Sequence, residues 1–280
     1  MVGFPSFLCI ALIWMPTIAS ILLSFTNWRG ITAITPANIV GLKNYETLFT
    51  TYPFFWPAVA HNVLWLIVFV FIATPLGIFL AVLLDRELRG TRIYQSVFFI
   101  PVVLSLAVVG FIWQLQYTSQ GFINSVLGTT RQDNVIDWLG NPDLNIWAVL
   151  VAASWRHVGY VMVLYLAGLK SVDPTLREAA SIDGASARQI FFRVVFPVMQ
   201  PINVVVVVVT VIESLRAFDI AYIVNRGKNG LELLSILITN NSISEASLIG
   251  FGSAIAVVLL VISLVPIVIF LARTMRTDPT

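Results

Sequence analysis

The chain has 280 residues, of which 58% are hydrophobic and only 11% are charged, and its mean hydropathy is +0.91. A soluble domain carries about 25% charged residues, so this chain lacks the polar surface that a water-soluble protein needs. The formal net charge of +2 is too small to indicate a nucleic-acid partner. The single cysteine, Cys9, excludes an internal disulfide and a cysteine metal site. We therefore expect an integral membrane protein.

Apolar segments long enough to cross a membrane recur along the whole chain. Crossing about 30 Å of hydrocarbon takes roughly 20 helical residues. We place six such spans near residues 4–26, 61–84, 97–116, 147–169, 198–217 and 251–272. The expected fold class is therefore all-α, with residues 1–280 forming a single transmembrane domain of six helices.

Two of these spans need a decision about their type. The first has no basic region before it and is too long for the apolar core of a signal peptide, so we expect a retained helix. The fifth contains the valine run 204–209, which has strand propensity. An open strand cannot satisfy its backbone in lipid, so we expect a helix there as well.

The distribution of Lys and Arg predicts the orientation. The connections near 85–96 and 170–197 and the tail after 272 hold most of the positive charge, in Arg86, Arg89, Arg92, Lys170, Arg177, Arg188, Arg193, Arg273 and Arg276. The three longer connections, near 27–59, 117–146 and 218–250, hold only Arg29, Lys43, Arg131, Arg226 and Lys228. We expect the first set, and with it both termini, to be cytoplasmic.

The cytoplasmic stretch 174–197 is the long polar-rich interval between two apolar spans. Asp173-Pro174 predicts a helix start, with Asp as the N-cap and Pro at the first helical position. A short helix would run through 175–182, the Asp183-Gly184 turn would end it, and a second helix would follow through 185–195. Such a pair can lie on the bilayer surface, or it can fit a groove on a soluble partner.

The residues of this stretch resemble a known motif. Glu178, Ala179 and Ala180, followed by Asp183-Gly184-Ala185 and the closing Pro197, resemble the EAA loop of ABC-importer permeases. Three further segments are similar to carbohydrate-importer permeases of the maltose-type group: Phe25-Thr26-Asn27-Trp28, Gly41-Leu42-Lys43-Asn44-Tyr45 and Phe99-Ile100-Pro101. The family's usual Leu-Pro is Phe196-Pro197 here. Its usual basic leader is missing before the first span, which would fit a truncated or misassigned start.

The resemblance implies the fold, the partners and the location of the protein. The fold would be that of a type I ABC importer permease in a bacterial or archaeal plasma membrane. Its partners would be a second homologous permease in a heterodimer, two ATPase subunits, an extracytoplasmic solute-binding protein and a saccharide. The EAA residues would contact the ATPase.

No catalytic site is visible in the sequence. A Gly-x4-Gly-Lys-Ser/Thr phosphate loop is absent, and Gly227-Lys228-Asn229 shares only two letters with it. His61 and His157 are far apart and have no metal-ligand cluster around them. We therefore expect a transport subunit without a cofactor of its own, with ATP and Mg²⁺ bound by the partner ATPase. A gradient-driven carrier would also fit.

Polar side chains at membrane depth point to a solute path, because each costs a few kcal/mol unless it faces a cavity or a partner. One cluster lies in the fourth span, at Trp155, Arg156, His157 and Tyr160. A second lies at the end of the fifth span, at Glu213, Ser214, Arg216, Ala217 and Asp219. The spacing predicts that Arg216 pairs with Glu213 and Asp219 along one helix, which alone would neutralise charge. By the resemblance, both clusters line a sugar cavity.

The charges separate the candidate solutes. A glycerol-phosphate-type solute would be attracted by Arg156 and Arg216, but Glu213 and Asp219 offset their field. A neutral or amino-bearing saccharide is therefore favoured. The rival class is a stand-alone proton-coupled carrier with His157, Glu213 and Asp219 as the relay, and a non-transporting scaffold is the third.

Overall fold

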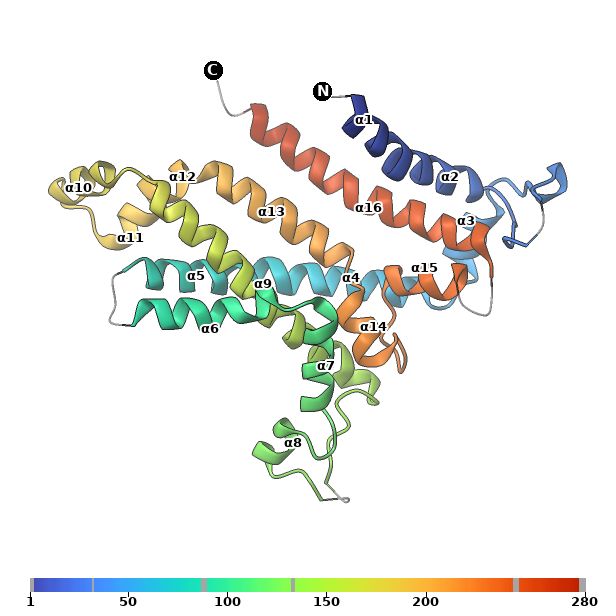
Figure 1. Ribbon diagram of the computed structural model, residues 1–280, viewed down its shortest axis with the longest axis horizontal. Helices are drawn as coiled ribbons and strands as arrows, with labels where there is room; N and C mark the ends of the chain where they lie inside the picture. Colours follow the sequence, from blue (N-terminus) through green and yellow to red (C-terminus); the bar gives the residue numbers. More distant parts are fainter. Residues whose placement is uncertain (1–2, 32, 87–89, 132–133, 244–246, 277–280) are drawn as a thin grey trace.

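The structure is a computed structural model that describes residues 3–31, 33–86, 90–131, 134–243 and 247–276 (Figure 1). Throughout these ranges the elements are helical, and the only β interaction is an isolated antiparallel bridge between Thr26 and Ile39. The all-α prediction is confirmed. Arg89 and the side chains of Arg273 and Arg276, which contributed to the predicted orientation, lie outside what is described.

Four continuous helical segments are long and apolar enough to cross a membrane: Gly3–Leu23, Phe55–Asp85, Pro142–Ser171 and Ile249–Phe270. Two bent helix pairs would bring the number of spans to six if each pair is one span. The continuous segments consist of α1 (Gly3–Cys9), η1 (Ile10–Trp14) and α2 (Met15–Leu23); α4 (Phe55–Val68), η3 (Phe69–Ala73) and α5 (Thr74–Asp85); α9 (Pro142–Ser171); and α16 (Ile249–Arg276).

The predicted third span is not one straight helix. It consists of α6 (Thr91–Val103) and α7 (Leu106–Gln116), whose axes differ by 102°. Leu104 and Ser105 have extended backbones, and the Ser105 hydroxyl accepts a hydrogen bond from the Val108 amide at 3.3 Å. Ser105 therefore caps a new helix, and α7 leaves the bundle towards α8 (Phe122–Leu127; Figure 1).

The predicted fifth span corresponds to α13 (Gln200–Leu215), which follows α12 (Phe196–Val198) after a bend of 79°. The helix ends at Leu215, and the chain is irregular at 216–218 before α14 (Asp219–Asn225) begins. Arg216 and Ala217 thus lie beyond the helix that was expected to carry them. The remaining elements are η2 (Pro36–Asn38), α3 (Lys43–Thr50), α10 (Pro174–Ile182), α11 (Ala187–Ile190), η4 (Phe191–Val195) and α15 (Leu234–Ser242).

The long helix α9 is the centre of the bundle and packs against α4, α5, α6, α7, α13 and α14 (Figure 1). Two glycines explain how closely its neighbours approach. A Cβ on Gly77 of α5 would lie 2.7 Å from the Val161 Cβ, and a Cβ on Gly159 of α9 would overlap the Phe98 carbonyl of α6. Small residues at helix contacts allow such close packing in a bilayer. These contacts hold α5, α6 and α9 together at one end of the bundle.

Candidate functional site

A cavity of about 170 Å³ lies beside the two places where helical spans are interrupted. Leu106, the first residue of α7, and the irregular residues 216–218 border it. Interrupted helices at membrane depth are tolerated where they line a cavity, and such sites are common in transporters. The wall is formed by Trp65, Phe69, Leu106, Ala153, Arg156, Ile212, Glu213, Arg216, Ala217, Phe218, Asp219 and Ile220.

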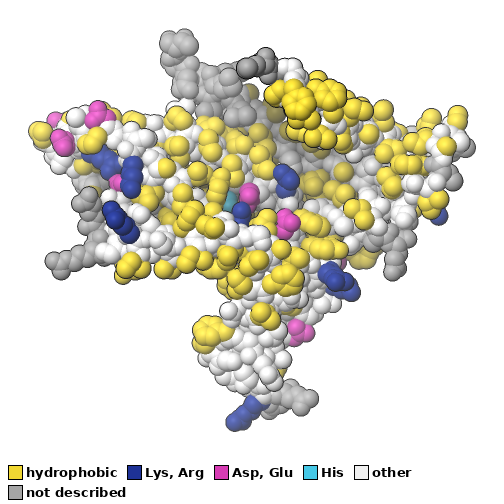
Figure 2. All heavy atoms as spheres, viewed as in Figure 1, with side chains coloured by type: hydrophobic (Ala, Val, Ile, Leu, Met, Phe, Trp, Pro, Cys, Tyr) yellow, Lys and Arg dark blue, Asp and Glu magenta, His cyan; other side chains and the backbone are white. Residues whose placement is uncertain are grey.

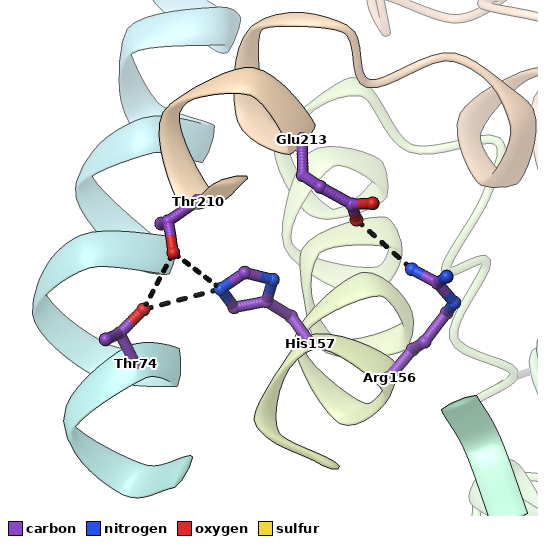
Figure 3. Close-up of polar contacts among 5 residues, drawn as sticks. All are labelled: Thr74, Arg156, His157, Thr210 and Glu213. Carbon is purple, nitrogen blue, oxygen red and sulfur yellow. Dashed lines mark hydrogen bonds and ion pairs between the residues drawn. The ribbon is translucent and has the colours of Figure 1, made fainter. Parts of the chain in front are cut away.

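An ion pair joins two walls of this cavity. Nη1 of Arg156 on α9 donates to Oε2 of Glu213 on α13 at 3.1 Å (Figure 3). The Arg156 side chain is 18% exposed and that of Glu213 is 37% exposed, so the carboxylate keeps capacity for further hydrogen bonds. The predicted pairing of Arg216 with Glu213 and Asp219 is wrong. Glu213 pairs with Arg156 instead, neither Arg216 nor Asp219 forms an ion pair within the described residues, and Asp219 belongs to the next helix, α14.

His157 faces away from Arg156 and is part of the bundle packing. Its side chain is 1% exposed, and Nε2 lies 3.2 Å from Oγ1 of Thr210 and 3.3 Å from Oγ1 of Thr74 (Figure 3). The imidazole also stacks on Phe69 at a centroid distance of 4.2 Å. His157 therefore links α9 to α5 and α13 and is not part of the cavity wall. Its Nδ1 finds no hydrogen-bond partner within the described part of the chain.

The structure separates the predicted solute-path residues into two groups. Arg156, Glu213, Arg216 and Ala217 border the cavity. The others lie elsewhere: Trp155 packs edge-on against Trp113 at 5.9 Å, the Tyr160 ring lies 6.4 Å from His157, and Ser214 is fully buried and donates to the Val211 carbonyl.

Sequence reasoning missed the aromatic side of the cavity and the polar contacts behind it. Trp65 and Phe69 are four residues apart and therefore share a helical face, but in an apolar run they are indistinguishable from core residues. Thr74 and Thr210 carried a usable signal, because each is a hydroxyl inside a long apolar segment. Such residues bond across helices in membranes.

The second candidate site is the exposed helical pair at the end of the bundle. Its first helix, α10, begins at Asp173, which accepts from the Thr175 amide at 2.9 Å, and this bond holds the pKa of Asp173 below its usual value. The helix ends in a Schellman arrangement: the Gly184 amide bonds to the Ser181 carbonyl and the Ala185 amide to that of Ala180. Gly184 has φ +78°, a backbone conformation that glycine tolerates best.

The second helix of this pair starts later than predicted. Ser186 and Gln189 form a capping box, with the Ser186 amide donating to Oε1 of Gln189 at 2.7 Å. The helix therefore begins at Ala187 and not at Ala185, and it continues through the π-helical turn η4 and α12. Ile190, Phe191 and Phe196 pack against the buried core cluster around Met162 and Val195, so this half is attached to the bundle.

The outer surface of the pair is exposed. Glu178, Ala179, Asp183, Gly184 and Pro197 are exposed, Ala180 and Ala185 are half-buried, and the Ile182 side chain is 86% exposed. Behind them Arg177 anchors α10: Nη1 lies 2.7 Å from Oδ2 of Asp85 on α5, and Nη2 donates to the Leu169 carbonyl of α9 at 2.8 Å. The predicted EAA residues thus form a protruding surface with a firm attachment.

A helical bundle with interrupted spans around a polar cavity, and with a protruding helical pair at one end, defines a polytopic membrane transport protein. Residues 73–276 match the binding-protein-dependent transport system inner membrane components, and the chain belongs to this family. The resemblance to ABC-importer permeases is confirmed.

Named relatives cover most of the chain. The xylose/arabinose import permease XacH of Haloferax volcanii is 32% identical over 86% of this chain and 76% of its own length. The trehalose/maltose transport permease MalF of Thermococcus litoralis is 30% identical over 87% and 82%. A crystal structure of a bacterial ABC transporter involved in import of the acidic polysaccharide alginate matches with a TM-score of 0.83 at 18% identity, covering 99% of this chain and 95% of that chain. The fold is that of a type I ABC importer permease.

Proposed function

We propose that this chain is the transmembrane permease subunit of an ATP-driven, binding-protein-dependent sugar importer in a bacterial or archaeal plasma membrane. The observation that carries the proposal is the protruding α10–α11 pair, with its exposed Glu178 and Ile182 and its Arg177 anchor. An amphipathic helix of this kind fits a groove on a soluble partner. The partner is an ATPase subunit, which supplies the ATP and Mg²⁺ chemistry.

Membership of the family supports the assembly that we propose around the chain. The chain pairs with a second, homologous permease, two ATPase subunits bind the cytoplasmic face, and an extracytoplasmic protein delivers the solute. All six spans cross the membrane as one domain of residues 1–280, both termini are cytoplasmic, and segment 174–197 couples to the ATPase.

The cavity supports a saccharide as the solute. Trp65 and Phe69 border it with aromatic rings, and Glu213 offers a carboxylate oxygen to sugar hydroxyls. The wall carries two arginines and two carboxylates, so its charges balance. The names of the xylose/arabinose and trehalose/maltose permeases support the same substrate class.

We infer transport by alternating access. Closure of the ATPase dimer pushes on α10, and Arg177 passes this displacement to α5 and α9 through Asp85 and the Leu169 carbonyl. Movement of α9 against α13 opens the cavity between Arg156 and Glu213 outward. The loaded binding protein and ATP must both favour this outward state, because a ligand shifts an equilibrium only through differential affinity.

Purification and reconstitution test the proposal. The tagged chain should copurify with an ATPase subunit and a second permease from its native membrane. In proteoliposomes the complex should take up the sugar only with ATP and the binding protein, and an uncoupler should have no effect. Uptake by the chain alone that ignores ATP and collapses with an uncoupler would instead establish a proton-coupled carrier. Preference for glycerol phosphate over every neutral sugar would show that the substrate is a glycerol-phosphate-type solute and not a saccharide.

A further inference from the structure

A second cavity, of about 630 Å³, opens at the end of the bundle that carries α10 and α11. It lies between the end of α5, the beginning of α6 and the end of α9, and the solute path does not use it. Its wall consists of Leu84, Asp85, Gly90, Thr91, Arg92, Gln95 and Lys170. Figure 2 shows dark blue basic side chains gathered at this end of the molecule.

The charges of this cavity favour an anion. Among the described residues of the wall, only Asp85 carries a carboxylate. Its Oδ2 is already paired with Nη1 of Arg177 at 2.7 Å. Arg92 and Lys170 are exposed, and within the described ranges neither has a carboxylate oxygen within the 4.0 Å of an ion pair. Two cations on the wall of one cavity, neither of them in an ion pair with another described residue, are an arrangement that can bind phosphate oxygens.

An apolar surface continues from the cavity along α6. Phe99 and Val103 are 41% and 68% exposed, and they follow Arg92 by seven and eleven residues, so the three side chains lie on one helical face. This face begins at Arg92 and runs away from the bundle end into the apolar part of the helix. A ligand with a phosphate in the cavity and a hydrocarbon chain along this face would contact both features.

We propose that this cavity binds the headgroup of an anionic phospholipid from the leaflet at this end of the bundle. Arg92 and Lys170 hold the phosphate, and Phe99 and Val103 contact an acyl chain. Basic pockets between membrane helices are known to bind acidic headgroups in this way. The site depends on membrane insertion and not on the identity of the transported solute, so it can fail without affecting the proposed transport function.

Native mass spectrometry of the purified full-length complex, titrated with phosphatidylglycerol in detergent micelles, tests this assignment. The unaltered protein should retain phosphatidylglycerol in preference to phosphatidylcholine with the same acyl chains. The double variant Arg92→Gln with Lys170→Gln should bind phosphatidylglycerol about thirty-fold more weakly, because two surface cations near the headgroup are lost. The double variant Arg92→Lys with Lys170→Arg should retain most of the binding.

The control removes the same charge at the opposite end of the bundle. Arg226→Gln with Lys228→Gln should leave phosphatidylglycerol binding unchanged. Equal loss in this control, or undiminished binding after loss of Arg92 and Lys170, would overturn the assignment. Inorganic phosphate, added as a competitor, should displace the lipid only weakly. Displacement at equal concentration would identify a site for free phosphate, and the acyl-chain contact would be disproved.

Discussion

The guanidinium of Arg156 on α9 and the carboxylate of Glu213 on α13 meet at 3.1 Å, and this contact joins two of the helices that line the cavity of about 170 Å³. His157, which follows Arg156 on α9, points to the opposite side and forms hydrogen bonds with Thr74 and Thr210. Two adjacent residues of α9 therefore differ in role. Arg156 lines the cavity, and His157 connects α9 to the neighbouring helices α5 and α13.

Charge reversal tests the Arg156–Glu213 pair. Arg156→Glu and Glu213→Arg should each destabilise the protein and reduce transport, because each leaves two like charges facing one another. The double reversal should recover part of both losses. Since the Glu213 side chain is 37% exposed, we expect a coupling of only about 1 kcal/mol. Thermal unfolding of the four proteins in detergent measures it, and strict additivity would show that the pair does not form.

Replacement of His157 should affect stability. His157→Phe keeps an aromatic ring against Phe69 but removes the nitrogen that Thr74 and Thr210 share. Leaving buried hydroxyls with fewer partners costs about 1–3 kcal/mol, which should lower the melting temperature. Tyr160→Phe is the control, since no hydrogen bond of its hydroxyl occurs among the described residues. A proton relay through His157 would predict lost transport at unchanged stability.

Gly184→Val should abolish coupling to the ATPase. Space is available, because nothing lies within 4 Å of a Cβ built there, but φ is +78° and a β-branched residue resists this conformation. The turn between α10 and α11 would rearrange, and solute-stimulated ATP hydrolysis should disappear while membrane insertion persists.

Gly128→Val is a matched control for that variant. Gly128 has φ +70° and equally open surroundings, but it ends α8 at the other side of the molecule. Its backbone penalty should be similar and its effect on stimulated ATP hydrolysis small. Equal activities of both glycine variants, whether high or low, would disprove the role of segment 174–197.

Loss of the Arg177 anchor should weaken the link between α10 and the bundle. Arg177→Gln removes the contacts to Asp85 and the Leu169 carbonyl, at a cost of about 1–2 kcal/mol because the site is partly exposed. Solute-stimulated ATP hydrolysis should fall severalfold at normal membrane levels. Arg193→Gln, an exposed residue of the same segment, should have little effect. Undiminished solute-stimulated ATP hydrolysis in Arg177→Gln would show that the contacts of Arg177 are not needed for coupling.

Local chemistry in the sequence was sufficient to predict most of the helices. Hydropathy located the apolar segments, since the transfer of a long apolar helix into lipid depends on composition alone. Asp173-Pro174 and Asp183-Gly184 placed both ends of α10, because caps and positive φ are properties of a few adjacent residues. Ser186 was overlooked as an N-cap, so the start of α11 was misplaced.

The tertiary structure decided directions and partners. Hydropathy carries no information on the axis of a helix, so the 102° turn at Leu104–Ser105 was not foreseen. Spacing along one helix suggested that Glu213 pairs with Arg216, but the helix ends between them and Arg156 arrives from α9 instead. The sequence alone determined that this is a helical membrane protein with an EAA-like segment. Which polar side chains share the cavity depended on how separate helices pack, because those contacts join residues far apart in the chain.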